Sequence, residues 1–242
     1  MTAKPPNQDR NLYAVAGWSH IMPFAAWILA MAGLEWIGGP AAWKYVFRTV
    51  LCCGLFGYLR PWQWYARPVW RQLPAAVAAG VLVFASWVLP ETAWMDRWPA
   101  VRDFYLTWLV FPLGKLPAYV LDSPYAPERA GWFFSLIRLA GSAFVIAVIE
   151  EFFWRGFLYR WMLKRNFLDV APGQAADWTI VLGLSLAFGL EHDRWFVGAL
   201  AGLIYLQVYR RSGDLWSAIA AHATTNLLLG IYVLSSGAYR FW

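Results

Sequence analysis

Long runs of apolar residues, separated by short polar segments, divide the chain into candidate membrane-spanning helices. A helix needs about 20 mostly apolar residues to cross a bilayer. We predict seven spans, at residues 11–34, 41–59, 72–90, 131–149, 178–190, 195–209 and 215–236. The fifth and sixth are short, and short spans must tilt, thin the bilayer or border a water-filled cavity. The pattern predicts an all-α, polytopic membrane helix bundle that forms a single domain over residues 1–242.

Basic residues are distributed unevenly around these spans and therefore predict an orientation. They follow the second, fourth and sixth spans, as the clusters Arg60, Arg67 and Arg71, then Arg160, Lys164 and Arg165, then Arg210 and Arg211. With seven spans all three clusters fall on one side, which the positive-inside rule assigns to the cytoplasm. The amino terminus is then also cytoplasmic. Residues 104–121 are apolar but contain Pro112, Lys115 and Pro117, and an eighth span there would separate the clusters. We expect that segment to be interfacial or re-entrant.

The composition indicates a membrane protein and argues against a soluble domain, a nucleic-acid-binding protein and a disulfide-rich fold. The chain is 60% hydrophobic and 14% charged, whereas soluble domains are about 25% charged. Its 18 Trp and 12 Tyr residues fit the aromatic belts of membrane interfaces. Basic residues beside the spans account for the net charge of +6, so no nucleic-acid partner is needed. Cys52 and Cys53 are adjacent and cannot build a disulfide framework.

Two adjacent carboxylates, Glu150 and Glu151, directly follow the apolar run 144–149. A charge near the centre of a bilayer costs roughly 2.5–3.5 kcal/mol on insertion scales, and such residues usually serve a function. Glu151 and Arg155 are four residues apart and can pair on one helix face. Glu150 points about 100° away from Glu151 and has no local partner. One carboxylate is thus predicted to be structural and the other to be available for chemistry.

Further polar residues recur at helical spacing in the fifth to seventh spans. His192 follows Phe188 by four residues, and His222 and Asn226 are also four apart, which places each pair on one helix face. Because buried polar groups must satisfy one another, we expect the helices that carry them to meet.

Taken together, these residues resemble a known family. Glu-Glu-x-x-x-Arg at 150–155, Phe-x-x-x-His at 188–192 and His-x-x-x-Asn at 222–226 are similar to the three signature motifs of the CPBP family. These are the CAAX-protease and bacteriocin-processing intramembrane proteases, also called Abi or Rce1-like. The resemblance covers residues 131–236. The sequence that flanks the motifs is also similar to that of the CAAX-protease-related branch found beside bacterial exosortase systems. It implies a bacterial inner-membrane protein, with exosortase-system proteins as partners.

The resemblance also implies an activity and roles for the motif residues. The chain would be an intramembrane endopeptidase that hydrolyses a peptide bond of a protein or peptide substrate near the membrane. Glu150 would activate the water, and His192 would hold and polarise it. His222 and Asn226 would donate hydrogen bonds to the oxyanion, while the Glu151–Arg155 pair braces the site.

A metal mechanism is an alternative that the residues leave open. Glu150, His192 and His222 offer one carboxylate and two imidazoles, which can bind Zn²⁺ together with a water. No His-Glu-x-x-His sequence is present, and Arg155 and Asn226 suit a metal-free glutamate mechanism. We favour an enzyme without a cofactor, with zinc as the alternative.

Other functions are also compatible with single elements of the pattern. Glu150 and the histidines could form the proton relay of a transporter, although the polar residues cluster at one level and no inverted repeat is evident. A non-catalytic membrane scaffold is the third hypothesis. His20, without a polar neighbour in sequence, is expected to be structural. The charged group Glu191, Asp193 and Arg194 is expected to be solvated.

Overall fold

The computed structural model describes residues 6–117 and 122–242. Its α-helices are α1 (Pro6–Leu34), α2 (Ala41–Leu59), α3 (Leu73–Val88), α4 (Pro99–Trp108), α5 (Pro127–Ala130), α6 (Trp132–Ala140), α7 (Ala147–Glu151), α8 (Tyr159–Leu163), α9 (Trp178–Gly189), α10 (Trp195–Ser212) and α11 (Leu215–Ser236). The described residues contain no β-strand, and the predicted all-α membrane bundle is confirmed.

Four segments are long and apolar enough to cross a membrane. They are Asn11–Leu34, Trp70–Glu91, Trp132–Leu163 and Leu215–Ser236, and they correspond to the first, third, fourth and seventh predicted spans. The remaining three predicted spans form helices α2, α9 and α10, which do not meet the same criterion. For α9 the reason is its length of 12 residues. Seven is therefore an approximate count of the helices that cross the membrane.

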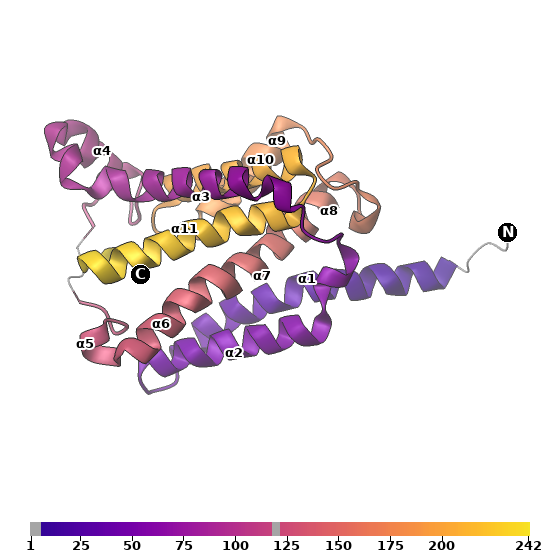
Figure 1. The fold of residues 1–242 in the computed structure, drawn as a ribbon, viewed down its shortest axis with the longest axis horizontal. Coiled ribbons are helices and arrows are strands. Elements are labelled where there is room, and N and C mark those ends of the chain that lie inside the picture. Colours follow the sequence, from indigo (N-terminus) through magenta and orange to yellow (C-terminus); the bar gives the residue numbers. More distant parts are fainter. Residues whose placement is uncertain (1–5, 118–121) are drawn as a thin grey trace.

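The segment expected at 104–121 contains the second half of α4, and residues 118–121 lie outside the described part of the chain. Helix α4 lies at one end of the bundle, beyond α3 (Figure 1). Phe104 and Trp108 on this helix are exposed. Its position at the membrane interface stays a prediction.

One long helix forms the centre of the arrangement. Helices α6, α7 and α8 continue one another from residue 132 to 163, joined by two π-helical segments, Gly141–Ile146 and Phe152–Leu158. This helix runs between the α1–α2 pair and the α3–α11 pair, with α9 and α10 beside the latter (Figure 1). The helices that carry the sequence motifs are thereby placed next to one another.

Two glycines allow α3 and α10 to approach the motif-bearing helices α11 and α9 closely. A Cβ atom on Gly80 of α3 would lie 2.3 Å from the carbonyl oxygen of Ala221 in α11. Thr225 uses this proximity to donate a hydrogen bond of 2.9 Å to the Gly80 carbonyl. A Cβ on Gly202 of α10 would lie 3.1 Å from Cβ of Phe188 in α9. Small residues of this kind are what close helix packing in membranes requires.

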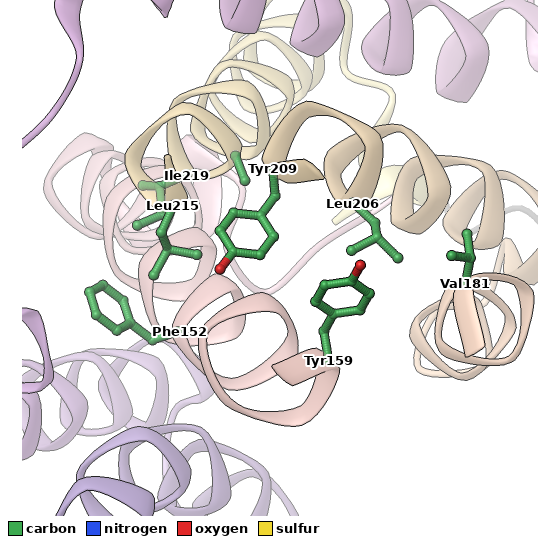
Figure 2. Close-up of a cluster of buried hydrophobic side chains, with 8 residues drawn as sticks. Phe152, Tyr159, Val181, Leu206, Tyr209, Leu215 and Ile219 are labelled. Carbon is green, nitrogen blue, oxygen red and sulfur yellow. The ribbon is translucent and has the colours of Figure 1, made fainter. Parts of the chain in front are cut away.

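A cluster of buried side chains holds the end of the bundle where α8 to α11 meet. Figure 2 shows Tyr159 and Tyr209 in its middle, with Phe152 and Leu215 on one side. All four are at most 2% exposed, and the two tyrosine rings meet edge to face, with centroids 6.1 Å apart. The cluster fixes α11 against the helix that carries the glutamate pair.

Candidate active site

The glutamate pair lies on a short α-helical segment between two π-helical ones. Helix α7 contributes Glu150 and Glu151, and the π segments begin and end directly beside it. A π turn contains an extra residue, so it rotates the side chains that follow and widens the helix locally. Such turns occur frequently at functional sites.

Glu151, Arg155 and His222 form one buried network, with side chains that are 0%, 3% and 5% exposed. Arg155 Nη1 donates to Glu151 Oε1 at 2.9 Å, and its Nη2 donates to the Gly202 carbonyl at 2.8 Å. The same Glu151 oxygen lies 3.0 Å from Nδ1 of His222. The ring of Tyr205 stacks on His222 with centroids 4.7 Å apart. The predicted Glu151–Arg155 pair is present, and it also orients a histidine from another helix.

Glu150 lies on the other side of this histidine. Its Oε2 atom is 3.9 Å from Nε2 of His222, a distance too long for a hydrogen bond. That oxygen is buried and has no hydrogen-bond partner among the described residues. A carboxylate oxygen held in this way is an acceptor without a donor, as expected for a group that meets a water or a substrate.

Asn226 is positioned by the first π segment. Its Nδ2 atom donates to the Ser142 carbonyl at 2.9 Å, and the same carbonyl accepts the N–H of Ala147. An asparagine amide carries two N–H donors, so one remains for another acceptor. Sequence reasoning missed Ser142, because its contribution is a backbone oxygen that no side-chain pattern reports.

His192 lies in the turn between α9 and α10, and Phe188 separates it from His222. The Phe188 ring centroid is 5.1 Å from that of His192 and 5.8 Å from that of His222. His192 Nδ1 lies 2.9 Å from the Phe188 carbonyl, so this nitrogen carries the proton. Removal from water lowers the pKa of His192 to about 4. The ring is therefore neutral near pH 7, and its Nε2 is an acceptor.

A cavity of about 510 Å³ connects these groups. His192, His222, Asn226 and Tyr205 all line it, whereas Glu150 is not among its lining residues. The Oε2 atom of Glu150 approaches the cavity-lining His222, at 3.9 Å from Nε2 of that ring. The structure thus brings both histidines and the asparagine to one space, and the unpartnered carboxylate lies next to His222, outside the lining of the cavity.

One residue of the charged group after α9 differs from expectation, whereas Glu191 and Asp193 are exposed as expected. Arg194 is not solvated: its guanidinium is buried and makes two hydrogen bonds, of 2.5 and 3.0 Å, to the carboxylate of Glu91. Burial of this arginine is possible because a carboxylate 103 residues away in sequence compensates its charge. Glu191 lines the cavity and accepts a hydrogen bond of 3.2 Å from Trp154 Nε1.

His20 has a structural environment, as expected. It is buried, with Nδ1 2.7 Å from the Ala16 carbonyl and Nε2 2.8 Å from the Tyr65 hydroxyl. Both ring nitrogens are satisfied away from the cavity, so this histidine has no free atom for chemistry.

The alternative zinc site can be compared with the positions of its candidate ligands. Within residues 6–117 and 122–242, no three His, Cys, Asp or Glu side chains converge closely enough to hold a metal ion. Glu150, His192 and His222 thus do not form a ligand set in this arrangement, and no step of the chemistry below is assigned to a metal.

Comparison with known proteins adds a family assignment. Residues 132–228 match the family model described as type II CAAX prenyl endopeptidase Rce1-like. This interval contains α6 to α10 and the part of α11 that carries His222 and Asn226. No significant match was found among curated proteins or among solved structures. The family of the matched region consists of membrane-embedded proteases. The chain therefore carries an Rce1-like domain of the CPBP, or CAAX protease, family.

Proposed function

We propose that the chain is an intramembrane endopeptidase that hydrolyses a peptide bond with a water activated by Glu150. The buried Oε2 atom of Glu150 without a donor is the acceptor for the proton of this water. Its oxygen bonds to the substrate carbonyl carbon, and Glu150 later passes the proton to the leaving amine as the carbon–nitrogen bond breaks. His192 supplies an Nε2 acceptor for the second hydrogen of the water.

The negative charge that develops on the carbonyl oxygen needs donors. Asn226 keeps one N–H for this purpose while Ser142 holds the amide in place. His222 donates from Nε2 when its ring carries both protons, and the Glu151 carboxylate on Nδ1 holds the ring in place, as a buried carboxylate does in hydrolase triads. Preset donors of this kind provide the largest single part of catalysis in many hydrolases.

One observation carries the proposal: Glu151 and Glu150 approach the two nitrogens of the same imidazole, at 3.0 and 3.9 Å. Oε1 of Glu151 contacts both Arg155 and His222, whereas no hydrogen bond among the described residues joins Glu150 to a partner; each carboxylate also has a buried Oε2 atom without a partner. A structural role for both carboxylates would leave the second one buried at a cost without a compensating contact. A division between one orienting and one reacting carboxylate accounts for the difference.

The orientation in the membrane is part of the proposal. The basic clusters around residues 60–71, 160–165 and 210–211 support a cytoplasmic amino terminus, by the positive-inside rule. Cysteine accessibility to a membrane-impermeant reagent tests this orientation, with single cysteines placed at the exposed residues 67 and 122 of a variant in which Cys52 and Cys53 are replaced.

Two assays on the purified protein separate protease from transporter. Incubation with membrane-derived peptides in detergent should yield defined cleavage products, identified by mass spectrometry. Proteoliposomes should show no protein-dependent proton or solute flux. Flux without cleavage over a broad peptide panel would contradict the proposal and favour a proton relay.

A further inference from the structure

His192 lies on a turn rather than on a helix. Helix α9 ends at Gly189 and α10 begins at Trp195, and Nδ1 of His192 is 2.9 Å from the Phe188 carbonyl near the end of α9. Loops are more mobile than the elements they connect, so a functional side chain on a loop depends on a rigid scaffold. The α9–α10 turn therefore needs further contacts to keep His192 in one place in the cavity wall.

Residues 87–111, from the end of α3 to just beyond α4, supply such contacts. The N–H of Phe111 donates to the Asp193 carbonyl at 2.7 Å. Nε1 of Trp195 donates to the Trp108 carbonyl at 3.0 Å. Both bonds use a backbone group of the 87–111 segment, so they depend on its position and not on a particular side chain there.

The most strongly fixed residue of the turn is Arg194, which is held by Glu91. Nε and Nη2 of Arg194 donate to the two oxygens of the Glu91 carboxylate, at 2.5 and 3.0 Å. The two side chains are 8% and 0% exposed. A bidentate pair of this kind fixes direction as well as distance. Arg240 donates to the same carboxylate at 3.0 Å, so Glu91 is itself held in place.

Trp87 completes the set of contacts. Its ring meets that of His192 edge to face, with centroids 5.4 Å apart, and it precedes Glu91 by one helical turn. Residues 192–195 are thus four consecutive positions, each of which is contacted by a different residue of the 87–111 segment.

The 87–111 segment lies outside the region that matches the family model, which is 132–228. The hydrogen bonds that orient Glu151, His222 and Asn226 come from within that region. The α9–α10 turn, by contrast, is held by a part of the chain for which neither the sequence motifs nor the family match provides a role.

We propose that Glu91 is a positioning residue for His192. Through its bidentate pair with Arg194 it holds the α9–α10 turn, and it thereby keeps the imidazole ring in the cavity wall. The consequence for hydrolysis rests on the proposed function, in which His192 holds the attacking water. The orientation of the ring does not, so one readout follows the ring and another follows the rate.

Two variants loosen the pair, and a third is the matched control. Glu91→Gln removes the charge that Arg194 faces. Arg194→Lys keeps both charges but replaces the planar fork by one ammonium group, which is not equivalent at a bidentate site. Arg102→Lys makes the same exchange at an arginine of α4 that pairs with Asp96. If Glu91→Gln does not fold, Arg194→Lys decides.

The first readout is the NMR spectrum of the imidazole groups in detergent. The chain contains three histidines, so protein labelled with ¹³C-histidine and purified with a histidine-free tag gives three ring signals. Replacing His20, His192 and His222 in turn by Gln assigns them. In Glu91→Gln and Arg194→Lys the signal of His192 should shift or broaden, because its ring moves against that of Trp87, while the other two signals stay in place.

Arg102→Lys should leave all three signals unchanged. An unshifted His192 signal in the folded variants would overturn the proposal. Equal shifts of all three histidines would also overturn it, since they would show a general loss of packing.

The second readout is the rate of peptide hydrolysis per folded protein. Glu91→Gln should lower kcat about tenfold or more with little change in KM, because small displacements of a positioned group can cost up to about a hundredfold. In a His192→Gln background the same change should have no further effect, since both act at one point. An equal further loss there would mean that Glu91 acts on something other than His192, and would overturn the proposal. A shifted His192 signal in a protein that cleaves no peptide would contradict the endopeptidase function and support the positioning role.

Discussion

Oε1 of Glu151 lies 3.0 Å from Nδ1 of His222, although 71 residues separate them in sequence. This contact joins the central helix to α11. It also determines that the other ring nitrogen, Nε2, is the one nearest to Glu150. The same oxygen accepts a hydrogen bond from Arg155. One carboxylate therefore serves both as the partner of a buried cation and as the orienting group of a histidine.

Replacement of Arg155 by Ala should mainly reduce the stability of the folded protein. The change leaves Glu151 as a buried charge without its cation, at a cost of roughly 3–5 kcal/mol. Folded yield and the thermal unfolding midpoint in detergent should both fall clearly, and Arg155→Lys should recover part of the loss. A fully stable Arg155→Ala protein would show that the pair does not brace the site.

Asn226→Ala should lower the turnover rate by roughly a hundredfold or more, with little change in peptide binding, because it removes one oxyanion donor. Ser142→Ala is the matched control. It removes a hydroxyl that contacts Leu139 and retains the carbonyl that holds Asn226, so its rate should be near that of the wild type. A similar loss in both variants would indicate a packing effect at the π segment.

The fold was largely predictable because its strongest signals are local. The first, third, fourth and seventh predicted spans agree with segments long and apolar enough to cross a membrane, since a mostly apolar run of about 20 residues has few alternatives in a membrane. The fourth span continues to residue 163, beyond the apolar run, because Glu151 and Arg155 pair with one another inside the bundle. Helix α9, with 12 residues, is too short to meet the length criterion for a membrane-spanning helix.

The site was predictable in its residue types and only partly in its contacts. A spacing of four residues revealed the Glu151–Arg155 pair, but no pattern indicated that His222 shares that carboxylate. The contact depends on how α11 is rotated against α7. Arg194 appeared solvated because its partner, Glu91, follows α3 and is distant in sequence. Such pairs become visible only when the helices are assembled.

The pH dependence of stability should contain a contribution from His192. An unfolded histidine has a pKa of about 6.5, whereas that of native His192 is lowered to about 4 by removal from water. Between these values the unfolded chain binds a proton that the native protein does not, so the free energy of unfolding falls as the pH drops from about 6.5 to about 4. Above pH 6.5 this histidine contributes no slope.

Thermal unfolding of the wild type and of His192→Gln, measured from pH 7.5 to 4.5, isolates this contribution. The wild-type midpoint should decrease more steeply below pH 6.5 than that of the variant. Parallel curves would mean that His192 is accessible to protons in the folded protein.

Metal dependence separates two mechanism classes. A glutamate enzyme should retain its activity after exhaustive treatment with 1,10-phenanthroline and should contain no stoichiometric zinc by elemental analysis. Activity that is lost on chelation and restored by zinc would contradict the metal-free mechanism, and would require Glu150, His192 and His222 to rearrange into a ligand set.

The most direct test of the account is the rate of peptide hydrolysis by purified Glu150→Gln, compared with the wild type and with Glu128→Gln, which changes an exposed carboxylate. Gln keeps the shape of the side chain but cannot accept the proton of the attacking water. A general-base role for Glu150 predicts that Glu150→Gln folds, unfolds near the wild-type temperature and cleaves no peptide, while Glu128→Gln cleaves at the wild-type rate. Near-wild-type cleavage by folded Glu150→Gln would contradict it.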